Sequence, residues 1–213
     1  MKYWTQSKRS CVTDTAQEFW INNKTNKGIV PIMRAASSSI KQILSDEPGW
    51  VESHSLQTVH KTYQFYTTWR EPYARFLSAI RRELQDILDQ HPGNERKAMN
   101  DTIDMWNKDP DIMLDLTHTI SQKDICIGAT NEGTNVKVFR FDLVDKMMRE
   151  ALGYNVTLPI LNQSTEIDPL ILEFISDTES KWMHNWCAKN YQTDFAIYNQ
   201  LLKFKTLSFN KFN

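Results

Sequence analysis

Cysteine is scarce in this chain of 213 residues, which has only Cys11, Cys126 and Cys187. They are odd in number, far apart and not arranged in CxxC pairs, so we expect neither a disulfide framework nor a zinc site. The histidines also lack the HxxxH and HExxH spacings of metal ligands, so no metal is expected. A reducing compartment is the simplest interpretation of this cysteine usage.

The chain also lacks an excess of either charge and any long apolar run. Its formal net charge is −1, whereas nucleic-acid and membrane-surface binders usually carry a basic excess, so neither partner is expected. No stretch approaches the roughly 20 apolar residues of a membrane span. Residues 1–20 interrupt every apolar run with polar side chains and show no signal peptide, which favours a cytoplasmic location.

What is present is an ordinary globular composition, with 40% hydrophobic and 24% charged residues, and a length that suits one domain over residues 1–213. Strand patterns alternate with helical ones, which predicts an α/β fold with a central parallel sheet flanked by helices. Residues 28–90 form the core of this pattern. Residues 92–121 resemble a helical insertion over the sheet edge, and residues 168–213 a helical C-terminal part. The expected strands cover 28–33, 50–54, 62–69 and 136–142.

The first segment with chemical meaning is PIMRAASSSI at 31–40, where a short apolar strand leads into a helix through small residues. Amide groups at such a helix start bind phosphate. Small side chains let an anion approach, hydroxyls donate hydrogen bonds and the arginine adds charge. The glycines and lysine of GxxxxGK[ST] are absent, which disfavours nucleotide triphosphate hydrolysis. The expected ligands are Arg34, Ala35, Ala36, Ser37, Ser38 and Ser39.

The second segment is YTTWREPYARFLS at 66–78, in which a strand ends at Arg70 and Pro72 begins a helix. Ser78 lies two turns along that helix, on a face that it shares with Arg75 and Arg82. We expect these groups to converge on a second phosphate.

Together the two segments resemble the sulfotransferases that use 3′-phosphoadenosine 5′-phosphosulfate (PAPS), closest to the heparan and chondroitin type of carbohydrate sulfotransferase. The family's K-x-[GA]-[ST]-[ST]-S loop corresponds to residues 34–39, and its R-[DE]-P-x-x-R-x-x-S motif to residues 70–78. The resemblance implies a P-loop-like three-layer fold, transfer of a sulfuryl group to a hydroxyl of a carbohydrate, and no metal. It implies that residues 34–39 hold the phosphosulfate and that Arg70 and Ser78 hold the 3′-phosphate.

Catalysis in this family needs a cation at the leaving phosphate and a base at the acceptor. Arg34 stands where the family has lysine, so either Arg34 supplies the charge or Lys41 contributes. His54 is the preferred base because it ends the expected strand 50–54 and ligands of open α/β sheets bind beyond the carboxyl ends of strands, with Glu52 and His60 as competitors. His60 and His118 are the expected acceptor contacts; His118 belongs to an element that resembles the family's H-x-x-x-Q.

Two other functions remain open from the sequence. One is a P-loop kinase of a small metabolite, which also binds phosphate at a loop between a strand and a helix. The other is a catalytically silent nucleotide-binding module, which is compatible with Arg34 in place of lysine. Trp182 and Trp186, spaced i, i+4, could stack on sugar rings, but this spacing is more typical of a buried helix face.

Overall fold

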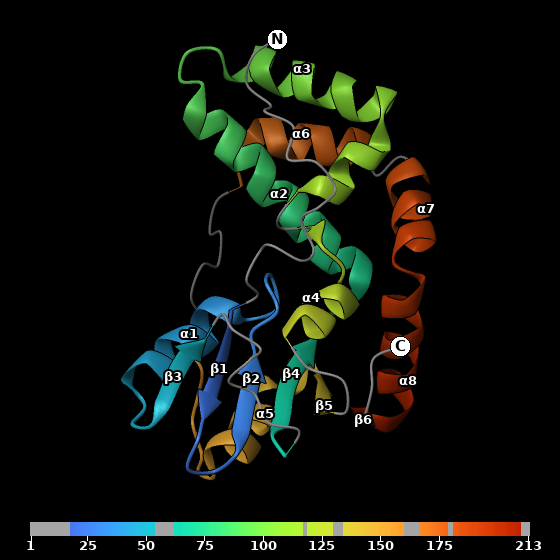
Figure 1. Ribbon diagram of the computed structural model, residues 1–213. Helices are drawn as coiled ribbons and strands as arrows, with labels where there is room; N and C mark the ends of the chain where they lie inside the picture. Colours follow the sequence, from blue (N-terminus) through green and yellow to red (C-terminus); the bar gives the residue numbers. More distant parts are fainter. Residues whose placement is uncertain are drawn as a thin grey trace.

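The computed structural model describes residues 18–53, 62–116, 119–129, 134–159, 167–178 and 181–209. Within these residues the fold is α/β, with helices around one mixed sheet (Figure 1). The strands are β1 (Phe19–Asn22), β2 (Lys27–Val30), β3 (Trp50–Ser53), β4 (Gln64–Trp69), β5 (Asn135–Arg140) and β6 (Thr206–Phe209). The α-helices are α1 (Ser37–Asp46), α2 (Pro72–Gln90), α3 (Glu95–Lys108), α4 (Gln122–Ala129), α5 (Val144–Leu152), α6 (Pro169–Thr178), α7 (Lys181–Asn190) and α8 (Gln192–Phe204). Two 3-10 segments are η2 (Pro110–Asp115) and η4 (Phe141–Leu143).

The sheet has the strand order β3-β1-β2-β4-β5-β6. β4 pairs in parallel with both β2 and β5, so the expected parallel core is present. The expectation of a parallel sheet is nevertheless wrong at the flanks. β1 runs antiparallel to β2 and β3, and β6 runs antiparallel to β5. The connection at 23–26 between β1 and β2 is too short for the crossover that parallel strands require.

Helices cover both faces of the sheet because successive strand residues point to opposite sides. Phe65 belongs to an apolar cluster with Ile125 of α4 and Leu201 of α8. Its neighbour Tyr66 belongs to a different cluster, with residues of α1 and α5 such as Leu44. The sheet thus lies between α4 and α8 on one side and α1 and α5 on the other.

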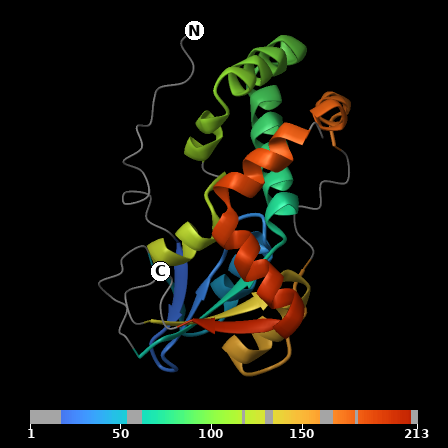
Figure 2. The ribbon, with the colours of Figure 1, turned by 90° about the vertical axis from the view of Figure 1, so that its right-hand side faces the viewer.

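A separate helical unit stands above the sheet and contains α3, α6, α7 and much of α2 (Figures 1 and 2). The apolar stripe of α2 is buried here through Phe76, Ile80, Leu84 and Leu88. Within residues 92–121, the helix α3 does not lie over the sheet edge as expected. α3 instead packs against α2, because Met99 and Trp106 on its inner face complete the core of the helical unit.

The C-terminal part is helical from Pro169, as predicted, but it ends in the additional strand β6. Trp186 is buried in the core of the helical unit and Trp182 packs against that core, so both tryptophans serve packing. α5 ends at Gly153, which forms a left-handed C-cap with a φ of 92°. Within the described ranges, no helix is both long enough and apolar enough to cross a membrane.

Candidate anion site at the carboxyl edge of the sheet

The carboxyl ends of β2, β4 and β5 meet at one edge of the sheet because these strands are parallel. β3 ends at the same edge, since it is antiparallel to β1 and β1 is antiparallel to β2. Ligands of open α/β sheets bind at this edge. It carries both sequence motifs, at 31–39 after β2 and at 70–78 after β4. His54, which follows β3, lies outside the described residues, as do His60 and His118.

The loop between β2 and α1 has a strained backbone. Arg34 and Ala36 have φ values of 63° and 65°, in the left-handed region that residues with a Cβ rarely adopt. Such strain persists only where the surroundings enforce it, and it clusters at ligand sites. The loop therefore enters the left-handed region at two positions without the glycine that usually permits it.

Helix α1 begins directly after this loop. The amide of Ile40 donates to the carbonyl of Ala36, so the amides of residues 37–39 precede the first bond of the helical ladder. Ser37 is half-buried, Ser38 is exposed and Ser39 is buried. An external anion can therefore reach the hydroxyls of Ser37 and Ser38, whereas Ser39 is buried in the protein interior.

The second motif folds back on the loop and binds its carbonyls. The carbonyl groups of residues 33, 34 and 35 each accept a hydrogen bond from a side chain in residues 68–75. The pairs are Met33 with Arg75 Nε (3.1 Å), Arg34 with Arg70 Nη1 (3.0 Å) and Ala35 with Thr68 Oγ1 (3.0 Å). These three bonds hold the loop in its strained conformation.

Arginine side chains gather beside this loop. Arg34 Nε donates to Ser78 Oγ over 3.2 Å, which joins the two predicted phosphate ligands directly. Burial lowers the pKa of Arg34, and repulsion from Arg82 and Arg70 lowers it further. Burial and then Arg81 lower the pKa of Arg70 in the same way. Arg81 Nε is buried and has no hydrogen-bond partner among the described residues. An anion placed between the guanidinium groups would relieve this mutual repulsion.

Arg70 is held firmly where β4 passes into α2. Its guanidinium lies 5.5 Å from the centre of the Phe141 ring, a cation–π contact with the segment that follows β5. The next residue, Glu71, caps α2 by accepting from the amides of Tyr73 (3.1 Å) and Ala74 (2.5 Å). Pro72 occupies the first turn, where its missing N–H has no cost.

Ala35, Arg75 and Lys41 have surroundings in the structure that the sequence did not predict. Ala35 is buried, and its amide donates to Ile32, so it shapes the loop from inside. Arg75 is only 1% exposed and faces the loop carbonyl rather than a second phosphate. Lys41, the alternative to Arg34, forms an ion pair with Glu18 on the α1 side.

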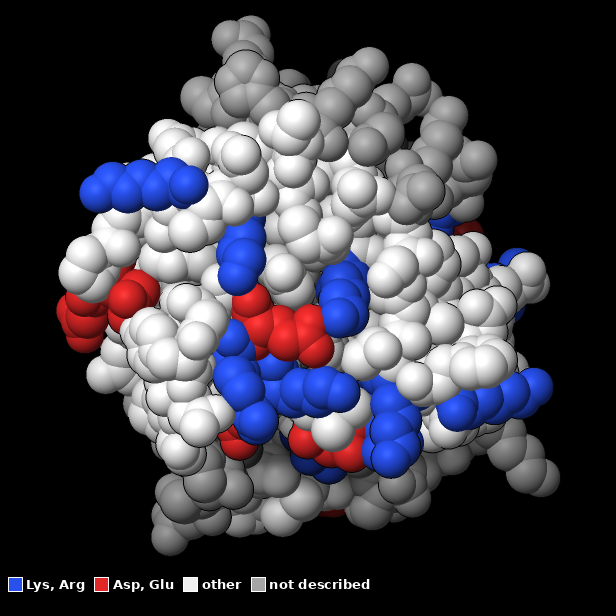
Figure 3. All heavy atoms as spheres, turned by 90° about the horizontal axis from the view of Figure 1, so that it is seen from below, with Lys and Arg blue, Asp and Glu red and all other residues white. Residues whose placement is uncertain are grey.

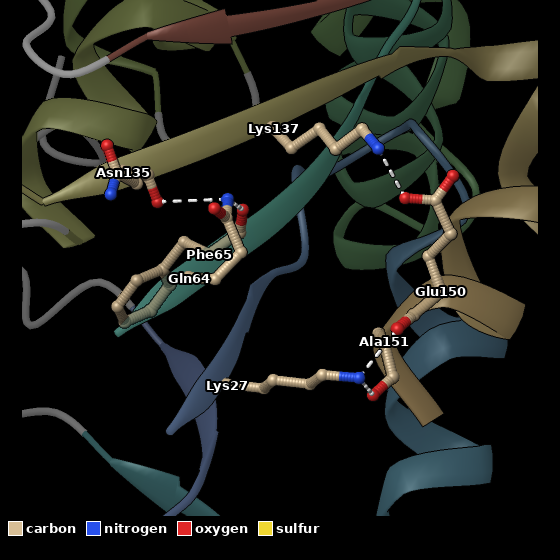
Figure 4. A network of polar contacts seen from close by, with 7 residues as sticks. All are labelled: Lys27, Gln64, Phe65, Asn135, Lys137, Glu150 and Ala151. Atoms are coloured by element: carbon tan, nitrogen blue, oxygen red, sulfur yellow. Dashed lines mark hydrogen bonds and ion pairs between the residues drawn. The ribbon is translucent and has the colours of Figure 1, made fainter. Parts of the chain in front are cut away.

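Lysines at the opposite end of the sheet have a structural use instead. Lys27 Nζ donates to the carbonyls of Glu150 (2.8 Å) and Ala151 (3.0 Å), and Lys137 pairs with the Glu150 carboxylate (Figure 4). They satisfy and neutralise the C-terminal end of α5. On the lower face of the molecule, basic and acidic side chains lie side by side (Figure 3). The arginines near Ser78 are therefore the better candidates for an external anion.

Sequence reasoning missed two residues that shape this site, Thr68 and Asp194. Thr68 binds the loop carbonyl of Ala35, and Asp194 accepts from the amides of Gln122 and Lys123 at the start of α4. A threonine in a strand carries no chemical signal, and neither does a single aspartate within a helical pattern. Comparisons with protein-family models, curated proteins and solved structures found no match for this chain. Within the described part of the chain, no group of three or more His, Cys, Asp or Glu side chains could hold a metal ion.

Proposed function

We propose that this chain is a sulfotransferase that moves a sulfuryl group from PAPS to a hydroxyl, on an acceptor of the carbohydrate class. The observation that carries the proposal is the contact between the two predicted donor motifs. Arg34 and Ser78, 44 positions apart, share a hydrogen bond, and Arg70 binds the backbone of Arg34. A donor with two separated phosphate groups needs two anion subsites next to each other, and the two motifs supply them.

In this proposal the amides at the start of α1, with Ser37 and Ser38, bind the 5′-phosphosulfate, while Arg70 and Ser78 bind the 3′-phosphate. Arg34 lies between the subsites and neutralises charge on the departing phosphate. The acceptor oxygen forms a bond to sulfur as the bond from sulfur to the 5′-phosphate oxygen breaks, which releases adenosine 3′,5′-bisphosphate. His54 takes the acceptor proton, with Glu52 and His60 as the alternatives.

The test is a melting experiment with matched nucleotides. At about a hundredfold excess over the dissociation constant, a ligand stabilises by about 2.7 kcal/mol. For a chain of this size that corresponds to a shift of about 5–11 °C. Adenosine 3′,5′-bisphosphate is expected to give this shift, and adenosine 5′-monophosphate, which lacks the 3′-phosphate, a much smaller one.

Two results would redirect the assignment. A shift with ATP and magnesium but none with the bisphosphate would favour a kinase and end the sulfotransferase proposal. Bisphosphate binding without transfer of labelled sulfate from PAPS to any of a panel of glycans and phenols, and without donor hydrolysis, would indicate a silent binding module.

A further inference from the structure

A buried polar network lies directly behind the donor motifs. Arg75 and Asp194 are each 1% exposed and Gln122 is fully buried. They come from α2, α8 and α4. Burying such groups costs free energy unless their hydrogen bonds are made inside the protein, so their partners indicate their roles.

Arg75 connects the phosphate loop to the segment before α4. Its Nε donates to the Met33 carbonyl over 3.1 Å, and its Nη2 donates to the Ile120 carbonyl over 2.6 Å. Burial lowers the pKa of the Arg75 guanidinium, and the negative charge of Asp194 opposes that shift. Only the planar fork of arginine reaches two carbonyls from one rigid group.

Gln122 holds the backbone of Arg70 on both sides. Its Oε1 accepts from the Arg70 amide over 2.9 Å, and its Nε2 donates to the Arg70 carbonyl over 3.0 Å. The side-chain amide thereby satisfies the peptide groups at the point where β4 ends. Because both bonds are made to Arg70 itself, they fix the position from which its side chain leaves the backbone.

Asp194, near the start of α8, fixes Gln122 in turn. Its carboxylate accepts from the amides of Gln122 (2.7 Å) and Lys123 (3.0 Å), and so caps α4. Its carbonyl accepts from the Trp69 indole over 3.2 Å, next to Arg70. One residue of α8 therefore orients α4 and touches the end of β4.

We propose that Arg75 and Gln122 are positioning residues of the donor site, and that Asp194 on α8 holds them in place. Arg75 sets the phosphate loop, and Gln122 sets Arg70. This inference rests on the proposed function, since it concerns binding of the same donor. It adds that donor affinity depends on the C-terminal helix α8, which makes no predicted contact with the donor.

The experiment compares Arg75→Lys, Gln122→Met and Asp194→Asn with Met183→Ala. Met183 is 1% exposed in the core of the helical unit and serves as the control for lost stability. Arg75→Lys keeps the positive charge but loses the planar guanidinium group, and Asp194→Asn keeps the shape of the side chain. Both variants are therefore expected to fold. Two quantities are measured at matched losses of melting temperature: the dissociation constant of adenosine 3′,5′-bisphosphate, and hydrogen exchange of the amides at 33–36 without ligand.

We expect bisphosphate binding to weaken by about tenfold or more in the network variants, since small displacements of binding groups are costly. It should stay within about twofold in Met183→Ala, because ΔΔG effects of distant sites are independent. Loop amides should exchange faster only in the network variants. If the wild type does not bind the bisphosphate but the exchange difference appears, the proposed function fails while the positioning role stands. Network variants that match Met183→Ala in both measurements would overturn the inference.

Discussion

The strained loop offers a matched pair of variants, Arg34→Gly and Ala36→Gly. A left-handed conformation costs a residue with a Cβ about 1–2 kcal/mol, and glycine removes that cost. Glycine also raises the entropy of the unfolded chain, which offsets about 0.4–1 kcal/mol. Ala36 further loses a half-buried methyl group that packs on the α1 side of the sheet. The Ala36→Gly variant should therefore unfold within about 1 kcal/mol of the wild type.

Arg34→Gly should be similarly neutral for stability. It loses the bond to Ser78, a contribution of about 1 kcal/mol. In return it relieves the same backbone strain and the repulsion from Arg82 and Arg70 that lowers the pKa of Arg34. The two variants thus make the same backbone change at nearly equal stability, and differ in whether a cation is removed.

Binding of adenosine 3′,5′-bisphosphate should separate the two. Loss of charge-assisted hydrogen bonds costs about 1.5–3 kcal/mol, or about 10- to 150-fold in affinity, so Arg34→Gly should bind that much more weakly. Ala36→Gly should stay within about threefold, because only the Cβ is lost. Urea unfolding measures stability and isothermal titration calorimetry measures affinity. Equal affinities of the two variants would show that the Arg34 side chain does not contact the donor.

Three further outcomes are expected. His54→Ala should lower sulfuryl transfer by about 10²- to 10⁴-fold in steady-state assays while bisphosphate affinity is retained, since a base acts on the acceptor; near-normal turnover would move the role to another residue. Burial raises the pKa values of Cys126, Cys187 and Tyr191, so these groups ionise at lower pH in the unfolded chain than in the folded one. The unfolding free energy should therefore fall above about pH 8.5, and it should fall less steeply in Cys187→Ala. An unfolding free energy that does not change at alkaline pH would contradict this. Trp186→Ala should lower unfolding free energy by about 3–5 kcal/mol in urea titrations yet leave bisphosphate affinity unchanged, because Trp186 lies in the helical core; weaker binding by the folded variant would place it in the site.

Local pattern was enough to predict the elements that carry the two motifs. The apolar run before Arg34 became β2, and the β-rich stretch before Arg70 became β4. Pro72 predicted the start of α2 correctly, since the preference of proline for the first turn is a local property. The strands β1 and β6 were missed, although β2 and β3 have the same length of four residues and were predicted. A segment this short shows no period of its own, so its prediction depends on its neighbours, and β6 directly follows the helical pattern of α8.

The direction of individual side chains could not be predicted in the same way. Arg75 and Ser78 share a helical face, which suggested a shared ligand, yet Arg75 turns inward to Met33 while Ser78 meets Arg34. Helical spacing gives the angle at which a side chain leaves the axis, but the partner is set by which segment packs there. For Arg75 that segment is the loop after β2, some 40 positions away in sequence, and its approach follows from the pairing of β2 with β4.

The absence of glycine from the loop between β2 and α1 is explained by the same pairing. A glycine-rich loop reaches a left-handed conformation by its own freedom, whereas Arg34 and Ala36 need an external constraint. The bonds from Thr68, Arg70 and Arg75 to three successive carbonyls supply that constraint. A change in any of these donors should therefore act on the loop as well as on its own position. The loop and the start of α2 behave as one unit, so the effects of substitutions in the two segments should not add.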